Sequence, residues 1–494
     1  MKNISNTKKI HIAIIILGTI FISLGAFHSN IWFDEAYSVG MAERTLSEIW
    51  TIGGHDVHPV LYYWMLRIVS LIATAWGATS IAIKIMIYRI FSVLPMAILG
   101  ILGYTHIKKD FGEKVGMLFS FLVFFLPESA IYATEIRMYS WSILAVTILA
   151  IYAYRLRLPE NSNRKNWLIF FFASISSIFL HYYGLMAAGL INIALLAYLI
   201  KNKRGKDIIA ICVLGLIQLL SYIPWLIYFV SQLTSISKGF WITFTFPNSL
   251  FEIMAGQFIG NLNYTLGFVI ALALYIYLGI RLYRTKENRM PAILSIAIYL
   301  AVIVAAIIMT KVLNTAILYY RYLFVITGLY IFAISYILSK EKNNEIVNCI
   351  CGIIIVLAIM NNINIIEDAY HENNFKQYEY LQENIEPGDK IVYEEIGHGS
   401  TMAVYFPENE QYFYNSGNWG VEEAYKALGS HMKTSTKEQL LENMEGRIWI
   451  IDKMDKPLYN SLFNNEEYKL ISEKEFWTEY HGYAMNMILV EKIN

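Results

Sequence analysis

The sequence predicts a polytopic α-helical membrane protein with a small α/β domain at its C-terminal end. Of the 494 residues, 56% are hydrophobic and only 16% are charged, a composition too apolar for a soluble globular chain. Apolar runs of about 18 residues or more, long enough to cross a bilayer as a helix, recur through the first 364 positions. After residue 365, these runs shorten to the length of strands, and acids, Asn, Lys and Tyr become common.

Eleven of the apolar runs predict membrane-spanning helices and define a transmembrane domain over residues 1–364. They lie near residues 10–28, 85–105, 113–131, 138–155, 167–181, 184–200, 208–230, 263–280, 291–310, 319–338 and 346–364. The first run follows Lys8 and Lys9 and has no clear small-residue cleavage motif before Asp34. We therefore interpret it as an uncleaved signal-anchor.

Basic residues on alternate connections predict how the chain is oriented. Lys and Arg gather on the connections that contain Lys108, Arg157, Lys203 and Arg284. By the positive-inside rule these connections are cytoplasmic, and so is the N-terminus. An odd number of spans then places the C-terminal domain outside the cell membrane. The formal net charge of +0 gives no reason to expect a nucleic-acid partner.

A further apolar run, residues 59–76, is predicted to lie in the outer interface. Counted as a span, which is the alternative, it would reverse the side of every basic connection downstream. Arg67 near its centre and its many Tyr and Trp residues favour an interfacial helix. Residues 29–84 then form one long outer loop.

The C-terminal segment 365–494 is predicted to be a small α/β domain outside the membrane. Residues 390–393 and 447–451 have the composition of buried strands, and residues 436–444 have the pattern of an amphipathic helix. All three cysteines fall inside apolar runs, so neither a disulfide framework nor a thiolate metal site is indicated.

Asp34 and Glu35 are the first candidates for chemistry. These adjacent carboxylates follow the first span directly. An acid so close to hydrocarbon is costly, so its presence indicates a function. One of them can act as a general base on a hydroxyl group. We favour Asp34, because Glu35 can instead pair with an arginine. The alternative is that both carboxylates only mark the membrane edge or cap a helix.

Glu135, Arg137 and Tyr139 form a second candidate group at the outer end of another span. If the segment is helical, Glu135 and Tyr139 share one face, four residues apart. Glu135 would then orient a substrate or a catalytic group, and Arg137 would neutralise a phosphate. The alternative is an interfacial ion pair with a snorkelling arginine.

His181 and Tyr182 lie in a predicted outer turn, and Arg321 opens a later span on the same side. Arginine matches phosphate oxygens with two parallel hydrogen bonds, so Arg321 is a candidate anchor for a lipid phosphate. Aromatic residues also form interface belts, and a solvated turn histidine or a snorkelling arginine is the alternative for each position.

Cofactor signals are weak. His55, Asp56 and His58 are metal ligands by residue type, but no second cluster has ligand spacing, so a divalent metal is possible and not expected to be obligatory. No glycine-rich phosphate loop is present. A sugar donor carried on a lipid would explain that absence, since cytosolic nucleotide sugars do not reach the outer face.

Four short motifs resemble those of the GT-C membrane glycosyltransferases, in particular glycosyltransferase family 39, with its protein O-mannosyltransferases and lipid A aminoarabinose transferases. These motifs are WFDEAY at 32–37, HPVLYY at 58–63, EIRMY at 135–139 and HYYG at 181–184. They cover about the first 200 residues in the family's order, and Arg321 weakly extends the match. Val60 stands where the family has a second proline.

The resemblance implies transfer of a sugar, with inversion, from a polyprenyl-phosphate donor to an extracytoplasmic glycan, lipid or protein. Asp34 would be the base, Glu135 and Arg137 a second acidic and basic element, and His58 a contact to the donor phosphate. Donors of this type generally need no metal. The C-terminal domain has no motif to transfer, and we expect its acids and histidines, such as Glu394 and His398, to have no catalytic role.

Three other functions remain open at this stage. A related enzyme could use a diphosphate-linked oligosaccharide. A secondary transporter would show repeated halves and polar sites near the midplane, which the sequence lacks. A non-catalytic scaffold would tolerate the loss of Asp34. The sequence does not identify the sugar or the acceptor.

Overall fold

The computed structural model describes residues 6–237, 242–260, 264–285, 288–394, 399–414, 422–429 and 432–493. The chain forms two compact units. The first, which we call the helical unit, comprises Met1–Ala26 and Arg89–Asn364. The second, the sheet unit, comprises Phe27–Tyr88 and Ile365–Asn494. The segment between the first two spans therefore groups with the C-terminal segment. The domain boundaries proposed above stay predictions.

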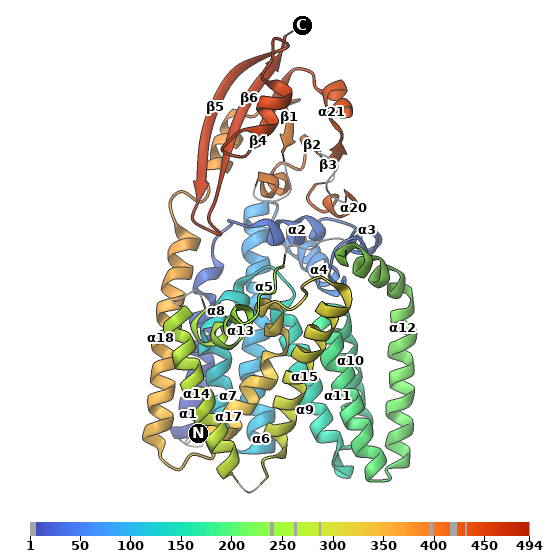
Figure 1. Ribbon diagram of the computed structural model, residues 1–494, viewed down its shortest axis with the longest axis vertical. Helices are drawn as coiled ribbons and strands as arrows, with labels where there is room; N and C mark the ends of the chain where they lie inside the picture. Colours follow the sequence, from blue (N-terminus) through green and yellow to red (C-terminus); the bar gives the residue numbers. More distant parts are fainter. Residues whose placement is uncertain are drawn as a thin grey trace. The chain divides into compact units, whose positions relative to one another are not determined.

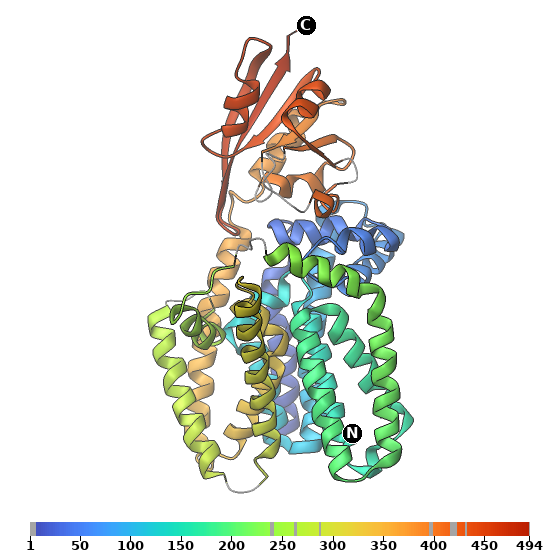
Figure 2. The same cartoon turned by 45° about the vertical axis from the view of Figure 1, so that its right-hand side comes forward.

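Long helices that lie side by side build the helical unit (Figures 1 and 2). Its α-helices, two of which extend into the other unit, are α1 Asn6–Ser23, α5 Ile81–Leu102, α6 Lys108–Phe111, α7 Glu113–Phe125, α8 Pro127–Thr134, α9 Tyr139–Leu156, α10 Arg164–Leu180, α11 Tyr182–Lys201, α12 Gly205–Ser237, α13 Asn248–Ile259, α14 Tyr264–Arg284, α15 Met290–Leu313, α16 Tyr320–Leu323, α17 Thr327–Ser339 and α18 Asn344–Tyr370.

The prediction of a polytopic helical membrane protein is confirmed. Nine helices within the described residues are long and apolar enough to cross a bilayer, or ten if the bent pair α7 and α8 is one span. All eleven predicted segments are helical. The segment at 167–181 corresponds to α10, which has 17 residues and is not among the nine.

The predicted span at 113–131 is broken in the structure, because α7 and α8 meet at a bend of 64°. Leu126 has extended backbone with ψ 129°, as expected of a residue that precedes proline, and Pro127 starts the new helix. The chain is also not helical from residue 135 to 138. Glu135 and Tyr139 therefore do not share a helical face, contrary to the expectation from their spacing.

The centre of the helical unit lies at α16 and α17. The span Tyr320–Ser339 is 89% buried, whereas the span within α12 is only 17% buried and lies at the rim. Gly328 allows α17 to approach α9, since a Cβ atom at this position would overlap Thr147 Oγ1. Next to Arg321, Tyr322 is buried, whereas Tyr319 and Tyr320 are partly exposed.

The sheet unit combines helices from the first loop with a C-terminal sheet. Its helices are α2 Phe33–Ala42, α3 Leu46–Gly53, α4 Leu61–Ala75, α19 Lys376–Asn384, α20 Glu422–Tyr425 and α21 Lys437–Asn443. Its strands are β1 Lys390–Tyr393, β2 Glu410–Tyr414, β3 Met432–Ser435, β4 Arg447–Asp452, β5 Tyr468–Thr478 and β6 Tyr483–Lys492. The two strands and the helix predicted in this segment are thus confirmed.

The six strands form one sheet in the order β3-β2-β1-β4-β6-β5. The pairs among β1, β2, β3 and β4 are parallel, and β6 pairs antiparallel with β4 and β5. Val392, Ile450, Ile488 and Leu440 belong to one buried cluster that joins the sheet to α21. Strand β5 at the edge of the sheet is mostly exposed, with Tyr468, Phe476 and Thr478 buried, whereas β4 is buried from Ile448 to Asp452.

Helix α4 corresponds to the run predicted to lie in the interface. It has 15 residues, shorter than the roughly 20 that a spanning helix needs. Arg67 Nη1 donates to the carbonyl of Ala42 at 3.1 Å, so protein oxygen satisfies this charged side chain. Nearby, Lys84 Nζ lies 3.0 Å from both carboxylate oxygens of Glu43. The placement of α4 at a membrane interface stays a prediction.

Candidate active site

Asp34 and Glu35 occupy the first turn of α2. The helix begins at Phe33, so its unsatisfied backbone N–H groups and its dipole favour negative charge at this end. The two side chains differ in exposure: Asp34 is partly exposed, whereas Glu35 is 0% exposed. Asp34 is therefore the more accessible of the two carboxylates, and Glu35 belongs to the packed interior of the sheet unit.

Glu35 is held by the hairpin turn between β5 and β6. Tyr480 Oη donates to Glu35 Oε2 at 3.0 Å, although the two residues are 445 positions apart. Burial raises the pKa of the hydroxyl of Tyr483, which follows this turn, and the charge of Glu35 raises that pKa further. The negative charge of Glu35 thus acts on two tyrosines of the hairpin.

The same turn contacts the segment that leads into α2. The ring of His481 stacks on Trp32 with a centroid distance of 4.4 Å and an interplanar angle of 13°, and Tyr480 packs edge-on against His28 at 4.9 Å. His481 has φ 60°, which is uncommon for a residue with a side chain. Asn374 Oδ1 accepts hydrogen bonds from the backbone N–H groups of Glu479 and Tyr480, both at 2.9 Å. These contacts fix a strained turn against the candidate base.

His58 lies beside Asp56 in the same unit. Its Nδ1 is 3.6 Å from Asp56 Oδ2, and Tyr63 Oη donates to the same carboxylate oxygen at 3.0 Å. His58 is buried, with 4% exposure. The carboxylate therefore lies beside the imidazole. Within the part of the chain that is described, no group of three or more His, Cys, Asp and Glu side chains converges as metal ligands would.

Glu135 and Arg137 lie in the non-helical stretch between α8 and α9. Both are buried, with 5% and 3% exposure, and the N–H of Arg137 donates to the carbonyl of Glu135 at 2.7 Å. Arg89 of α5, which is fully buried, donates from Nη1 to the carbonyl of Thr134 at 3.1 Å. Sequence reasoning missed Arg89, although an arginine inside an apolar run was a signal for it.

Aromatic rings surround His181 at the start of α11. Tyr139 and Tyr322 lie at centroid distances of 5.9 Å and 5.1 Å from its imidazole ring. The structure therefore brings together Tyr139 at the start of α9, His181 just before α11 and Tyr322 in α16. The guanidinium of Arg321 lies 5.7 Å from the ring centroid of Tyr319, next in this aromatic set.

Tyr182 contacts α12. Its hydroxyl donates to Gln232 Oε1 and accepts from Trp225 Nε1 at 3.2 Å. The two neighbours His181 and Tyr182 thus contact different helices, as successive residues at a helix start must. The structure places Tyr182 by these hydrogen bonds and does not test its predicted contact to substrate.

Glu128 is a buried acid that sequence reasoning did not select. It lies in the first turn of α8 with 3% exposure, and its Oε2 atom has no hydrogen-bond partner among the described residues. The side-chain amide of Asn361 donates to the carbonyl of the preceding Pro127 at 2.9 Å. The signal was present in the sequence as an acid after a proline inside an apolar segment.

The predicted site residues thus fall into two sets. Asp34, Glu35 and His58 belong to the sheet unit, and each has a defined orientation there. The other set belongs to the helical unit and comprises Glu135, Arg137, Tyr139, His181, Tyr182 and Arg321. The first set offers a base and its supports, and the second offers arginines and aromatic rings. The chemical roles of both sets stay predictions.

Comparison with known proteins gives a match of fold. No protein-family model and no curated protein sequence matches the chain. The structure is similar to that of ArnT from Cupriavidus metallidurans in the apo state, with a TM-score of 0.63 and 9% identity over 97% of each chain. It is also similar to ArnT of the same organism bound to undecaprenyl phosphate, with a TM-score of 0.60 and 10% identity over 98% of each chain.

This similarity defines the fold class. The chain is a multi-pass membrane protein with a C-terminal α/β domain, and its fold is similar to that of ArnT over nearly its whole length. At 9–10% identity the similarity shows the fold alone. Function has to be argued from the residues at the site.

Proposed function

We propose that this protein is a membrane glycosyltransferase that moves a sugar from a polyprenyl-phosphate donor to an acceptor hydroxyl at the outer face of the cell membrane. The observation that carries the proposal is the pair Asp34 and Glu35 in the first turn of α2, on a fold shared with ArnT. One of the similar ArnT structures is bound to undecaprenyl phosphate, which supports a donor on a lipid carrier. The closer relationship to glycosyltransferase family 39 is part of the proposal and rests on the four motifs.

The proposed reaction is a single displacement at the anomeric carbon. Asp34 takes the proton of the acceptor hydroxyl, whose oxygen attacks the anomeric carbon on the face opposite the phosphate. The bond between that carbon and the phosphate oxygen breaks, and polyprenyl phosphate leaves with the electron pair. The sugar is transferred with inversion. Positive charge must stabilise the departing phosphate, and arginine is suited to this task.

Exposure supports a division of roles between the two acids. Asp34 is partly exposed and serves as the base, while the buried Glu35 is fixed by Tyr480 and positions the start of α2. Arg137 and Arg321 are our candidates for the phosphate, together with His58. Glu135 acts as a second acidic element that orients a reacting group.

The aromatic residues fit a role in holding substrate. Tyr139 and His181 belong to one ring cluster and present flat surfaces of the kind that sugars and prenyl chains pack on. Tyr182, which is fixed by hydrogen bonds to α12, would border that cluster. The acceptor is an extracytoplasmic glycan, lipid or protein, and no divalent metal is obligatory in this scheme.

The proposal is tested by reconstitution of the purified protein with undecaprenyl-phosphate sugars. Candidate donors are obtained from a deletion strain, in which the true donor should accumulate on its lipid carrier. Release of undecaprenyl phosphate, followed by mass spectrometry, should require both the accumulated donor and an envelope acceptor. Asp34→Asn is the inactive control.

Two results would contradict the proposal. Release of undecaprenyl diphosphate would assign the protein to the oligosaccharide transferases that use diphosphate-linked donors. Uptake of solute into vesicles, with no transfer of sugar from any accumulated lipid, would support a secondary transporter.

A further inference from the structure

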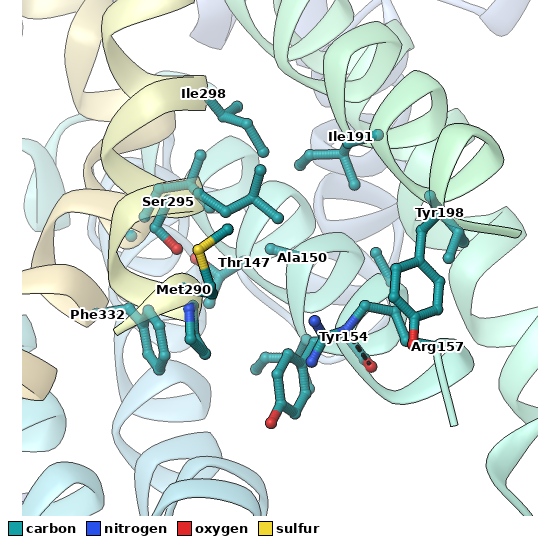
Figure 3. A pocket seen from close by; sticks show the side chains of 18 of the residues that line it. Thr147, Ala150, Tyr154, Arg157, Ile191, Tyr198, Met290, Ser295, Ile298 and Phe332 are labelled. Carbon is teal, nitrogen blue, oxygen red and sulfur yellow. Dashed lines mark hydrogen bonds between the residues drawn. The ribbon is translucent and has the colours of Figure 1, made fainter. Parts of the chain in front are cut away.

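The helical unit contains a cavity of about 390 Å³ among α9, α11, α15 and α17 (Figure 3). Most of its lining is apolar, for example Ala150, Leu195, Ile298, Leu329 and Phe332. A volume of this size is within the range of small-molecule sites, roughly 300–1,000 Å³. Predicted site residues from the outer ends of the helices are not among its lining residues. The cavity is therefore separate from the candidate active site.

One side of the cavity is basic. Arg157, at the C-terminal end of α9, and Lys201, at the C-terminal end of α11, both line it. The guanidinium of Arg157 lies 4.1 Å from the ring centroid of Tyr154 and 5.4 Å from that of Tyr198. Figure 3 shows Arg157 with these two tyrosines on one side of the cavity and Ser295 and Phe332 on the other.

Two other arginines at this end of the helices have acidic partners. Arg155 lies 2.7 Å from Asp110, and Arg281 lies 3.2 Å from Glu341. Among the described residues, by contrast, no carboxylate lies within 4.0 Å of either Arg157 or Lys201. Within the described part of the chain, the Arg157 side chain donates one hydrogen bond, from Nε to the carbonyl of Tyr154 at 3.3 Å. Its planar, stacked guanidinium is therefore available to an anion.

We propose that this cavity binds an acidic phospholipid, with an acyl chain among the apolar residues and the phosphate at Arg157 and Lys201. The apolar lining and the two basic residues of the cavity together select this occupant, because they match an acyl chain that carries a phosphodiester. The connections at this end carry the basic residues that predict the cytoplasmic side. Basic pockets between spanning helices on that side are typical sites of acidic lipids.

A buried hydroxyl group in the lining supports a site for a ligand with oxygen atoms. Thr147 lines the cavity with 4% exposure, and its hydroxyl has no hydrogen-bond partner in the described part of the chain. A buried hydroxyl without a partner is costly, and an ester carbonyl of a lipid could accept its hydrogen bond. Ser295 lies on the same side of the cavity and offers a further hydroxyl.

The experiment uses the full-length protein, purified and delipidated in detergent. Dioleoyl phosphatidylglycerol, dioleoyl phosphatidylcholine and undecaprenyl phosphate are added separately. Native mass spectrometry counts the bound lipid, and thermal unfolding measures its effect on the melting temperature. The variants are Arg157→Gln, which removes the phosphate contact, and Ala194→Phe, which fills the cavity. Arg284→Gln is the matched control, because Arg284 is also in the last turn of a helix at this end but does not line the cavity.

We expect phosphatidylglycerol to bind with a stoichiometry of one at this site and to raise the melting temperature more than phosphatidylcholine does. Arg157→Gln should weaken the apparent affinity about fivefold, the contribution of one basic residue near a membrane surface. Ala194→Phe should lose the specific response, and Arg284→Gln should keep it. Any variant that no longer folds is recognised by circular dichroism, and the comparison of the lipids on the wild type stands without it.

Three outcomes would overturn the proposal. An equal response to both phospholipids would mean that the cavity takes any acyl chain. A response to undecaprenyl phosphate alone would assign the cavity to the carrier lipid. An equal loss of affinity in Arg157→Gln and Arg284→Gln would show that a general surface charge, and not this site, attracts the lipid.

Discussion

The hydrogen bond between Tyr480 and Glu35 gives the sharpest test of how the C-terminal hairpin supports the candidate base. Tyr480→Phe removes only the hydroxyl that donates to Glu35 Oε2 at 3.0 Å. The ring stays in place, so its edge-on contact with His28 should remain. The change leaves a fully buried carboxylate short of one donor.

The expected magnitude follows from the charge of the acceptor. A hydrogen bond to a charged group contributes about 1.5–3 kcal/mol, and about 1.4 kcal/mol corresponds to a factor of ten in rate. If the start of α2 must be held in place in the transition state, turnover should fall about 10- to 100-fold. The KM for the donor should change less, because Glu35 is not expected to contact the donor in the ground state.

The assay measures kcat and KM for release of undecaprenyl phosphate from the donor identified in the deletion strain. Tyr378→Phe is the matched control, since its hydroxyl donates at 3.2 Å to Gln382 in an exposed part of α19. Circular dichroism and the melting temperature separate a loss of turnover from a loss of folding. Equal kcat values for Tyr480→Phe and Tyr378→Phe would refute the reasoning.

Four further predictions concern the base, the phosphate, the C-terminal domain and the topology. Asp34→Asn preserves size but cannot take a proton, so turnover should fall about 10²–10⁴-fold while donor binding survives; near-normal turnover would leave Glu35 or Glu135 as the next candidate. Arg321→Ala should lower the affinity for the donor, measured by titration with the lipid-linked donor, by a larger factor than it lowers kcat. An unchanged affinity would exclude Arg321 as the phosphate anchor. Glu394→Ala should retain turnover, whereas its loss in a folded variant would give the C-terminal domain a catalytic group. Reporters fused after Lys203 should read cytoplasmic and those in the C-terminal domain external; a cytoplasmic signal from the latter would mean that the spans were miscounted.

Most of the helical unit could be predicted from the sequence because a bilayer leaves few choices. Every backbone polar group within hydrocarbon has to be satisfied inside its own segment, so a long apolar run becomes a helix. The break at Leu126 and Pro127 shows where this reasoning fails. Hydropathy averages over the run, whereas the bend comes from the local clash that proline imposes on the residue before it. The expected common face of Glu135 and Tyr139 depended on a helical segment, and this condition is not met because the chain is not helical from residue 135 to 138.

The candidate site was predicted only in part. Asp34, Glu35 and Arg137 were found because charged residues at the end of an apolar run are costly and therefore informative. Tyr480 and His481 carried no such signal, because a Tyr and a His in a polar segment are ordinary. Their importance arises from a contact over 445 positions, which no local pattern encodes. His398, the histidine of the C-terminal domain that we expect to have no catalytic role, lies outside the described residues.

The contacts of the hairpin also change what the C-terminal segment is expected to do. The sequence suggested a separate domain without a catalytic role. In the structure, the first-loop segment with Asp34 belongs to the same compact unit as the sheet, and the strained residue His481 stacks on Trp32 just before α2. A left-handed backbone at histidine persists only where its surroundings hold it. The hairpin turn therefore acts as a fixed support for the first turn of α2, and truncation of the C-terminal strands should remove activity even though no catalytic group is expected there.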